Sequence, residues 1–264
     1  MKVNMILDNF RLNGRVALVT GARQGLGQGL AVALAEAGAD VAALDRFDVD
    51  ETCARITGLG RRCMPIQCDL RAASVADLNH LVEGVAAELG RLDILVNNAG
   101  IQRRAPAIEF SEADWDDVLQ INLKAGFFLS QAAARVMVKQ SSSNSPGVGK
   151  IINIVSMLSF QGGITVPAYT AAKSALAGVT RALANEWAIK HINVNAIAPG
   201  YMVTDNTAAL RADPIRNDSI SERIPAGRWG TPEDLGGAVV FLASQASDYL
   251  HGSIIAVDGG WLTR

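Results

Sequence analysis

The sequence has few of the residues from which metal sites and disulfide frameworks are built. Its 264 residues include three cysteines and three histidines. Cys53, Cys63 and Cys68 lack the spacing of a zinc site, and their odd number does not suit a disulfide framework. We therefore expect no metal ion and three reduced thiols, which is the usual state of cysteine in the cytoplasm.

Long apolar runs and a strong net charge are also lacking. No run of eighteen apolar residues predicts a membrane-spanning helix, and Asp8 interrupts the apolar start that a secretory signal would need. The formal net charge of -2 provides no basic field for nucleic acid or an anionic membrane. Because 49% of the residues are hydrophobic, we expect a folded protein. The reduced thiols and the lack of a membrane span or secretory signal favour a soluble, cytoplasmic protein, and we expect its partner to be a small molecule and not nucleic acid or a membrane.

Short apolar runs alternate with longer helical patterns along the whole chain. The expected strands are residues 16–20, 41–45, 63–67, 94–97, 151–155, 194–198 and 254–257. Most are apolar on both faces, as in buried parallel sheets. The alternation predicts an α/β chain: one Rossmann domain over residues 1–264 with a doubly wound, seven-stranded parallel sheet. Helical patterns cover 27–37, 114–139 and 169–189, a polar loop covers 140–149, and residues 204–228 form a candidate substrate loop.

A glycine-rich turn follows the first expected strand. It reads Thr20-Gly21-Ala22-Arg23-Gln24-Gly25-Leu26-Gly27. Glycine lets the backbone approach a pyrophosphate closely, and the helix that follows presents free N–H groups and its positive end. A turn of this kind can also be purely structural, but its place between a strand and a helix favours a dinucleotide site.

Asp45 ends the second expected strand, where a carboxylate can accept hydrogen bonds from the adenosine ribose. Its charge would repel a ribose phosphate, so we expect NAD as the cofactor. Arg46 leaves NADP as an alternative, because a guanidinium can pair with that phosphate. A structural role for Asp45 as a strand-end or helix-capping residue is the other interpretation.

Four polar residues form a candidate catalytic group. Tyr169 and Lys173 lie four residues apart in a helical stretch, so they project from one face, and a nearby ammonium favours the phenolate as a proton acceptor. Ser156 follows a strand and is placed to donate to a substrate oxygen. Asn122, a poor mid-helix residue, predicts a local break that holds a water against Lys173; a tolerated polar position is the alternative.

With these motifs the chain resembles the short-chain dehydrogenase/reductase family over essentially its full length. The resemblance implies a homotetramer, an NAD cofactor and the four catalytic residues above. It also implies further cofactor contacts at Asp69, Leu70, Asn97, Ala99, Gly100, Tyr169, Lys173, Pro199 and Thr204. Family members that use NADP often carry a basic residue where this chain has Gln24, which favours NAD, although Arg23 lies next to it.

Three stretches, 101–104, 156–163 and 199–207, further resemble the sugar-acid dehydrogenases of this family. A guanidinium can hold a carboxylate through two hydrogen bonds, so Arg103 and Arg104 are candidate substrate contacts, together with Gln161 and Tyr201. Solvated or interface arginines are the alternative. The predicted activity is NAD-dependent oxidoreduction of a sugar acid. Another sugar dehydrogenase, a 3-oxoacyl carrier-protein reductase and a catalytically silent dinucleotide sensor remain alternatives.

Overall fold

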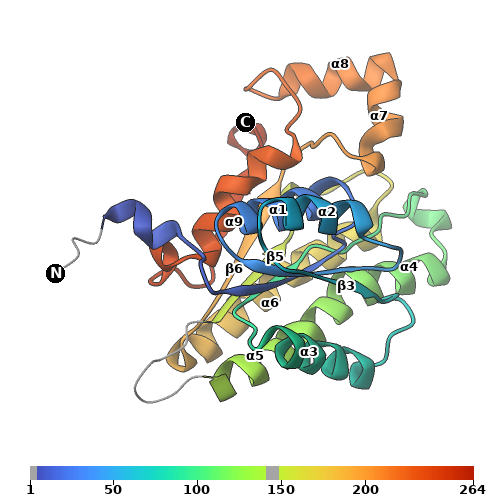
Figure 1. Cartoon of the computed structure of the whole chain (residues 1–264). Helices are drawn as coiled ribbons and strands as arrows, with labels where there is room; N and C mark the ends of the chain where they lie inside the picture. Colours follow the sequence, from blue (N-terminus) through green and yellow to red (C-terminus); the bar gives the residue numbers. More distant parts are fainter. Residues whose placement is uncertain (1–4, 141–148) are drawn as a thin grey trace.

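The computed structural model describes residues 5–140 and 149–264, and it forms one seven-stranded parallel sheet with helices on both faces (Figure 1). The strand order is β3-β2-β1-β4-β5-β6-β7. This confirms the predicted α/β Rossmann fold. The strands are β1 (Val16–Thr20), β2 (Asp40–Asp45), β3 (Cys63–Gln67), β4 (Ile94–Asn97), β5 (Gly149–Ile154), β6 (Ile192–Pro199) and β7 (Ile254–Val257).

Two apolar clusters, one on each face of the sheet, attach the helices. One face is covered by α1 (Gly25–Glu36), α2 (Asp50–Gly58) and α9 (Gly236–Ala243). The other is covered by α3 (Val75–Leu89), α5 (Gly126–Gln140) and α6 (Pro167–Trp187). The central strands β1 and β4 are buried along their whole length, as their uninterrupted apolar sequence requires.

The remaining α-helices lie at the carboxyl edge of the sheet. α4 (Glu112–Leu119) precedes α5, whereas α7 (Ala208–Ala212) and α8 (Pro214–Arg223) stand out from the body in the segment expected to be a substrate loop (Figure 1). The interior of the polar loop expected at 140–149 lies outside the described residues. Within the described ranges, no helix is both long and apolar enough to cross a bilayer.

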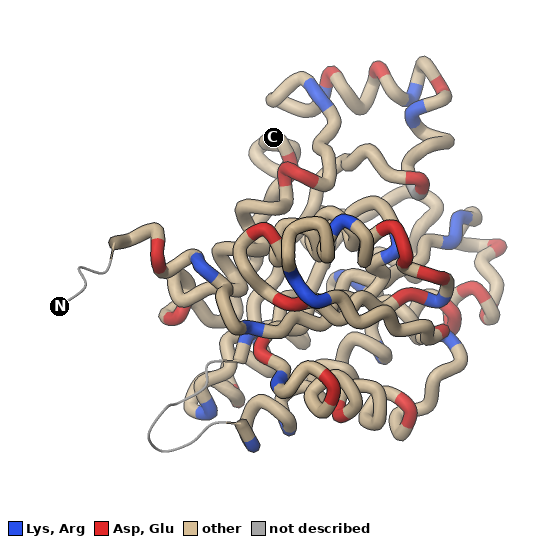
Figure 2. The backbone as a smooth tube through the Cα atoms, viewed as in Figure 1, with Lys and Arg blue, Asp and Glu red and all other residues tan. Residues whose placement is uncertain are grey.

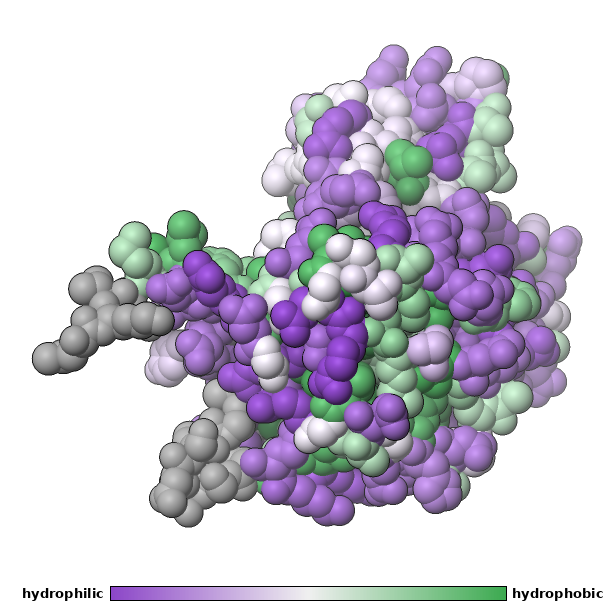
Figure 3. Space-filling model, viewed as in Figure 1, coloured by the Kyte–Doolittle hydropathy of each residue, from purple (hydrophilic) through white to green (hydrophobic). Residues whose placement is uncertain are grey.

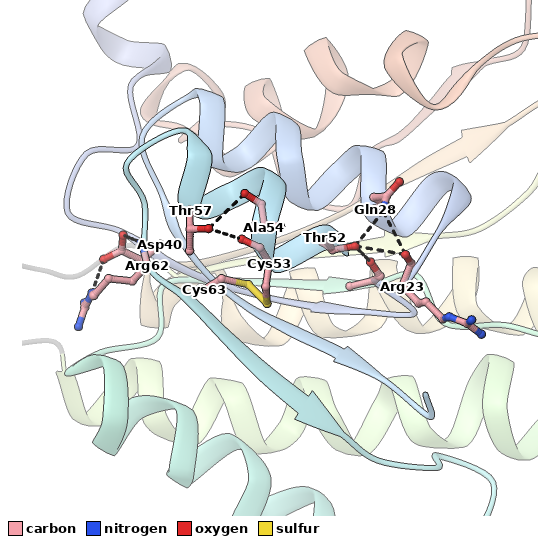
Figure 4. Close-up of a disulfide and its surroundings, with 10 residues drawn as sticks. Arg23, Gln28, Asp40, Thr52, Cys53, Ala54, Thr57, Arg62 and Cys63 are labelled. Atoms are coloured by element: carbon pink, nitrogen blue, oxygen red, sulfur yellow. Dashed lines mark hydrogen bonds and ion pairs between the residues drawn. A yellow bond between two sulfur atoms is a disulfide. The ribbon is translucent and has the colours of Figure 1, made fainter. Parts of the chain in front are cut away.

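The cysteines differ from the expectation of three reduced thiols. Cys53 in α2 and Cys63 at the start of β3 form a disulfide, with Cα atoms 5.2 Å apart (Figure 4). Cys68 is free. The prediction was wrong for the pair because helix α2 and strand β3 pack side by side after a short connection, a proximity that sequence spacing does not reveal.

Candidate active site

The candidate site lies at the carboxyl ends of the central strands. The strand order changes direction between β1 and β4, and open parallel sheets bind ligands in the crevice formed at such a point. The loops after β1, β4, β5 and β6 meet at this edge and carry most of the predicted site residues. The fold therefore brings together segments that are far apart in the sequence.

The glycine-rich turn is shaped for close contact with a ligand. A side chain at Gly27 would collide with the carbonyl oxygen of Gly21, so only glycine lets α1 begin this near to β1. Gly25 has a φ of 59°, and a Cβ added there would meet only Thr204, at 3.7 Å. The backbone at the start of α1 thus presents an open surface to a pyrophosphate.

The loop after β4 is locked to this turn. Asn98 Nδ2 donates to the carbonyl oxygens of Thr20, at 2.9 Å, and Gly21, at 3.2 Å. Thr20 Oγ1 accepts the N–H groups of Asn98, at 3.0 Å, and Ala99, at 2.9 Å. Asn98 was not among the predicted site residues. The signal that would have found it is an amide side chain directly after an expected strand, because the backbone carbonyls of a neighbouring strand end need a donor.

A buried threonine in α2 supports the turn from behind. Thr52 Oγ1 donates to the carbonyl oxygen of Ala22 at 2.7 Å and accepts from Gln28 Nε2 at 3.0 Å (Figure 4). Gln28 Nε2 also donates to the carbonyl oxygen of Arg23 at 3.1 Å. Sequence analysis missed Thr52, because a threonine in a polar helix carries no distinguishing pattern.

Both charge signs meet at the end of β2. Asp45 accepts the backbone N–H groups of Arg23, at 3.3 Å, and Phe47, at 3.2 Å. The guanidinium carbons of Arg23 and Arg46 lie 5.0 Å and 4.6 Å from the centre of the Phe47 ring. A carboxylate suited to ribose hydroxyls therefore lies beside two cations suited to a phosphate.

Asp69 and Leu70 lie at the end of the neighbouring strand β3. Asp69 is exposed and its side chain accepts the Arg71 N–H at 2.9 Å. Leu70 is buried, and its carbonyl oxygen accepts Gln120 Nε2 at 3.3 Å. Because β2 and β3 are adjacent, Asp69 lies next along the sheet edge from Asp45.

Helix α6 brings Tyr169 and Lys173 together as the spacing predicted. Lys173 is buried, its Nζ donates to the carbonyl oxygen of Ile154 at 2.7 Å, and the same atom lies 5.7 Å from the centre of the Tyr169 ring. Ser156, directly beyond β5, is also buried, and its Oγ accepts the Leu158 N–H at 3.1 Å. The three side chains thus meet where β5 and α6 adjoin.

Burial favours the uncharged forms of both Tyr169 and Lys173. It raises the pKa of Tyr169, against the opposing effects of the Ser156 hydrogen bond and the Arg104 charge, and it lowers the pKa of Lys173 to about 8. We expected a lowered phenol pKa. The difference has a physical reason, because the Lys173 ammonium is directed to the Ile154 carbonyl and desolvation dominates at the phenol.

Asn122 interrupts the long helix expected over 114–139. The chain passes from α4 through a π-helical turn, η3 (Gln120–Ala125), into α5. Asn122 Nδ2 donates to the carbonyl oxygens of Ile101 and Val118, each at 2.9 Å. Its Oδ1 is buried and has no hydrogen-bond partner among the described residues. A Cβ at Gly100 would lie 2.5 Å from that oxygen and 3.7 Å from Lys173 Nζ, so both atoms flank one point.

These features fit a nicotinamide dinucleotide, and comparisons with known proteins agree. A family model described as enoyl-(acyl carrier protein) reductase matches residues 21–262. Proteins named 2-dehydro-3-deoxy-D-gluconate 5-dehydrogenase from Dickeya dadantii and Escherichia coli are 58% and 57% identical over 260 residues, 98% of this chain and 100% of each relative. The chain belongs to the short-chain dehydrogenase/reductase family. It is an oxidoreductase that acts on CH–OH groups.

A solved structure supports the same fold for this dehydrogenase. A crystal structure from Agrobacterium tumefaciens, of a candidate 2-deoxy-D-gluconate 3-dehydrogenase with bound NADP, is 54% identical and aligns with a TM-score of 0.89. The alignment covers 97% of this chain and 100% of that one. The family resemblance stated from the motifs is confirmed, and a nicotinamide dinucleotide is the cofactor class.

One residue predicted to contact the cofactor of this dehydrogenase, Asn97, has its side chain in the core. The amide of Asn97 is buried and its Nδ2 donates to Asn153 Oδ1 and Ser130 Oγ, both at 2.9 Å. Asn97 therefore ties β4 to β5 and α5 inside the core. Pro199, by contrast, ends β6, and the segment beyond it reaches Thr204 beside the glycine-rich turn.

The predicted substrate residues of the dehydrogenase separate into different environments. Arg103 forms an ion pair with Asp114 at 3.2 Å, while Arg104 donates to Gln102 Oε1 at 2.8 Å. Tyr201 packs edge-on against Trp229 and Trp261, with ring centres 5.2 Å and 4.8 Å away. Gln161 is partly exposed in the loop between β5 and α6. Arg104 and Gln161 are thus the two whose side chains are not held by an ion pair or by an aromatic cluster.

Proposed function

We propose that this enzyme interconverts 2-dehydro-3-deoxy-D-gluconate and 3-deoxy-D-glycero-2,5-hexodiulosonate with NAD. The observation that carries the proposal is the meeting of Ser156, Tyr169 and buried Lys173 beside the loop after β4, which reads Asn97-Asn98-Ala99-Gly100. The names of the relatives that match over their full length support the choice of substrate.

In the proposed reaction Tyr169 moves the proton. Burial opposes loss of the phenol proton, and the positive charge of an oxidised nicotinamide would favour it. The phenolate then accepts the proton of the substrate hydroxyl as the C–H bond breaks, and in the reverse direction the phenol returns that proton. Ser156 Oγ donates to the substrate oxygen and stabilises the charge that develops there. Lys173 and Asn122 Oδ1 hold a water beside Gly100 that passes the proton outward. When bound, the dinucleotide supplies the hydride acceptor and, in its oxidised form, a positive charge.

Arg104 is the proposed contact for the substrate carboxylate. Among the described residues no carboxylate lies within ion-pair distance of its guanidinium, whereas Arg103 is already paired with Asp114. The charge of Arg104 also acts on the Tyr169 phenol. A sugar acid held there would have one end on Arg104 and its reacting hydroxyl between Ser156 and Tyr169. Gln161 and Tyr201 are the proposed neighbours of its other hydroxyls.

NAD is the proposed cofactor because the Asp45 carboxylate repels a ribose phosphate. Arg23 and Arg46 favour the phosphate instead, and a related structure contains NADP. The preference is therefore measured as kcat/KM with each cofactor. We expect the native enzyme to have the higher kcat/KM with NAD. In Asp45→Ser the kcat/KM with NADP should rise about tenfold, because loss of one charge contact changes the binding free energy by about 1.4 kcal/mol. NADP as the better native cofactor would overturn this part of the proposal.

A homotetramer in the cytoplasm completes the proposal. Three consecutive apolar residues are exposed at the protruding segment η1 (Ile6–Phe10) and its N-cap: Met5, Ile6 and Leu7 (Figure 3). Val240 and Phe241 of α9 are only partly buried. Such surfaces suit contact with further copies of the chain, and the cytoplasm holds the dinucleotide pools on which the enzyme depends.

The test of the substrate is a panel of acids assayed in parallel. The panel contains 2-dehydro-3-deoxy-D-gluconate, gluconate and a 3-oxoacyl thioester as alternative substrates. We expect the highest kcat/KM with 2-dehydro-3-deoxy-D-gluconate. Figure 2 shows acidic and basic residues interspersed along the backbone, and the formal net charge is -2, whereas binding of an acidic carrier protein would favour a basic patch. A higher kcat/KM for gluconate or the thioester would show that the proposed substrate is wrong. Cofactor binding without turnover of any compound in the panel would indicate a dinucleotide sensor.

A further inference from the structure

Thr165 has a backbone conformation that its side chain disfavours. Its φ is 64°, in the left-handed region that is rare for any residue with a Cβ and rarest for a β-branched one. Among the described non-glycine residues, only His191 shares a positive φ, and His191 lies at the end of a helical turn where this is common. Strain of this kind persists where the surroundings require it and often marks a functional segment.

The strained residue links two loops of the candidate site. The carbonyl oxygen of Thr165 accepts the N–H of Ala105 at 3.1 Å. Thr165 lies shortly before the first turn of α6, which carries Tyr169, and Ala105 directly follows Arg104. The next residue, Val166, is buried, and it anchors the chain where it enters α6. The bond therefore ties residues 101–105, which we call the arginine loop because they include Arg103 and Arg104, to the start of the catalytic helix α6.

The arginine loop has few other anchors. Asn122 holds its root through the carbonyl oxygen of Ile101, and Ile101 packs in the same apolar cluster as Tyr169. Arg103 is drawn to α4 by Asp114. Within residues 5–140 and 149–264, the one hydrogen bond of the Arg104 side chain is to Gln102, two residues earlier in the same loop. The position of its guanidinium relative to Tyr169 thus depends on how the backbone at Ala105 is held.

We propose that Thr165 is a positioning residue: its left-handed backbone directs the carbonyl that holds Ala105 and so keeps Arg104 beside Tyr169 to receive the substrate carboxylate. This inference rests on the proposed carboxylate contact at Arg104. It assigns to the loop before α6 a part in substrate recognition that requires no contact between Thr165 and the substrate.

The test compares KM and kcat for the sugar acid and for an analogue in which a neutral amide replaces the carboxylate. Ala105→Pro removes the N–H donor, and Thr165→Pro fixes φ at about -65° and so takes the backbone out of the left-handed region. We expect each variant to raise KM for the acid about fivefold to tenfold, to change kcat less than twofold, and to leave KM for the amide and the dissociation constant of NADH unchanged. The adjacent exposed variant Ile164→Ala is the matched control and should leave all four values unchanged.

A double-mutant cycle separates positioning from a general loss of structure. In an Arg104→Gln background, Ala105→Pro and Thr165→Pro should no longer raise KM for the acid. If they still raise it, or if the amide is affected equally, the inference is wrong. If Arg104→Gln alone leaves KM for the acid unchanged, the proposed carboxylate contact itself fails. If Arg104→Gln raises KM while neither loop variant does, only the role of Thr165 is overturned.

Discussion

The buried ammonium of Lys173 is the most demanding single group in the site. It lies in the core with one carbonyl partner, Ile154, and burial lowers its pKa to about 8. A charge kept in such a place costs folding free energy. This unfavourable burial occurs where the ammonium lies beside Gly100 and Tyr169. The proposed chemistry needs a proton-bearing cation at that point.

The stability of a Lys173→Met variant should depend on pH in a defined direction. The folded pKa of about 8 lies below the ordinary 10.5, so the unfolded chain binds more protons between these values and native stability rises with pH there. Methionine removes this dependence. We expect its stability advantage over the native enzyme to shrink by about 2 kcal/mol from pH 7 to pH 9.5. Urea unfolding at both pH values measures it, and a constant difference would contradict a depressed pKa.

At the scale of elements, the strands were easier to predict than the contacts that interrupt helices or join neighbouring elements. Hydrophobic runs located every strand within two residues at each end, because buried parallel strands have few alternatives. Helix interruptions were less visible: the π-helical turn at Asn122 depends on hydrogen bonds to Ile101 and Val118, which only the folded chain provides. The pairing of Cys53 with Cys63 likewise depends on packing.

Thr52→Val should weaken both the fold and cofactor binding. The valine keeps the shape but leaves the carbonyl oxygen of Ala22 and the amide of Gln28 without their buried partner, a loss of about 1–3 kcal/mol. We expect the dissociation constant of NADH to rise about tenfold. Fluorescence titration and urea unfolding measure the two effects.

Thr57→Val is the matched control on the same helix, because its exposed hydroxyl bonds only to α2 itself, at the carbonyl oxygens of Cys53 and Ala54. It should change stability by less than about 0.5 kcal/mol. Equal effects of the two valines on NADH binding would show that Thr52 does not support the turn.

Reducing the Cys53–Cys63 disulfide should lower the free energy of unfolding by about 2–3 kcal/mol, since the bond closes a loop with a sequence separation of 10. Urea unfolding with and without a reductant measures the change, and Cys53→Ser is the non-reducible comparison. An unchanged midpoint in the native enzyme, or three titratable thiols before reduction, would contradict a bond in the folded protein.

At the scale of the whole molecule, the sheet order assembles the site. The reversal of strand order between β1 and β4 brings the glycine-rich turn, the loop after β4 and the start of α6 to one edge of the sheet. The motifs predicted this assembly because each belongs to a strand end. They did not distinguish Arg103 from Arg104 or place Asn97 in the core, because those outcomes depend on partners such as Asp114 and Asn153 from other elements.

The proposed assembly makes a prediction at the same scale. Four chains of 27.8 kDa give a particle of about 111 kDa, which sedimentation equilibrium measures directly. We expect this mass at micromolar concentration. A single species at the mass of one chain would show that the exposed residues of η1 and α9 serve no assembly.

The most direct measurement of the central claim is single-turnover oxidation of the sugar acid by Tyr169→Phe. The substitution keeps the ring and removes the hydroxyl, so NADH should bind with the native dissociation constant. Hydride transfer should slow by at least about a hundredfold, as expected when a general base is lost. A variant that transfers hydride at more than a tenth of the native rate would show that another group moves the proton.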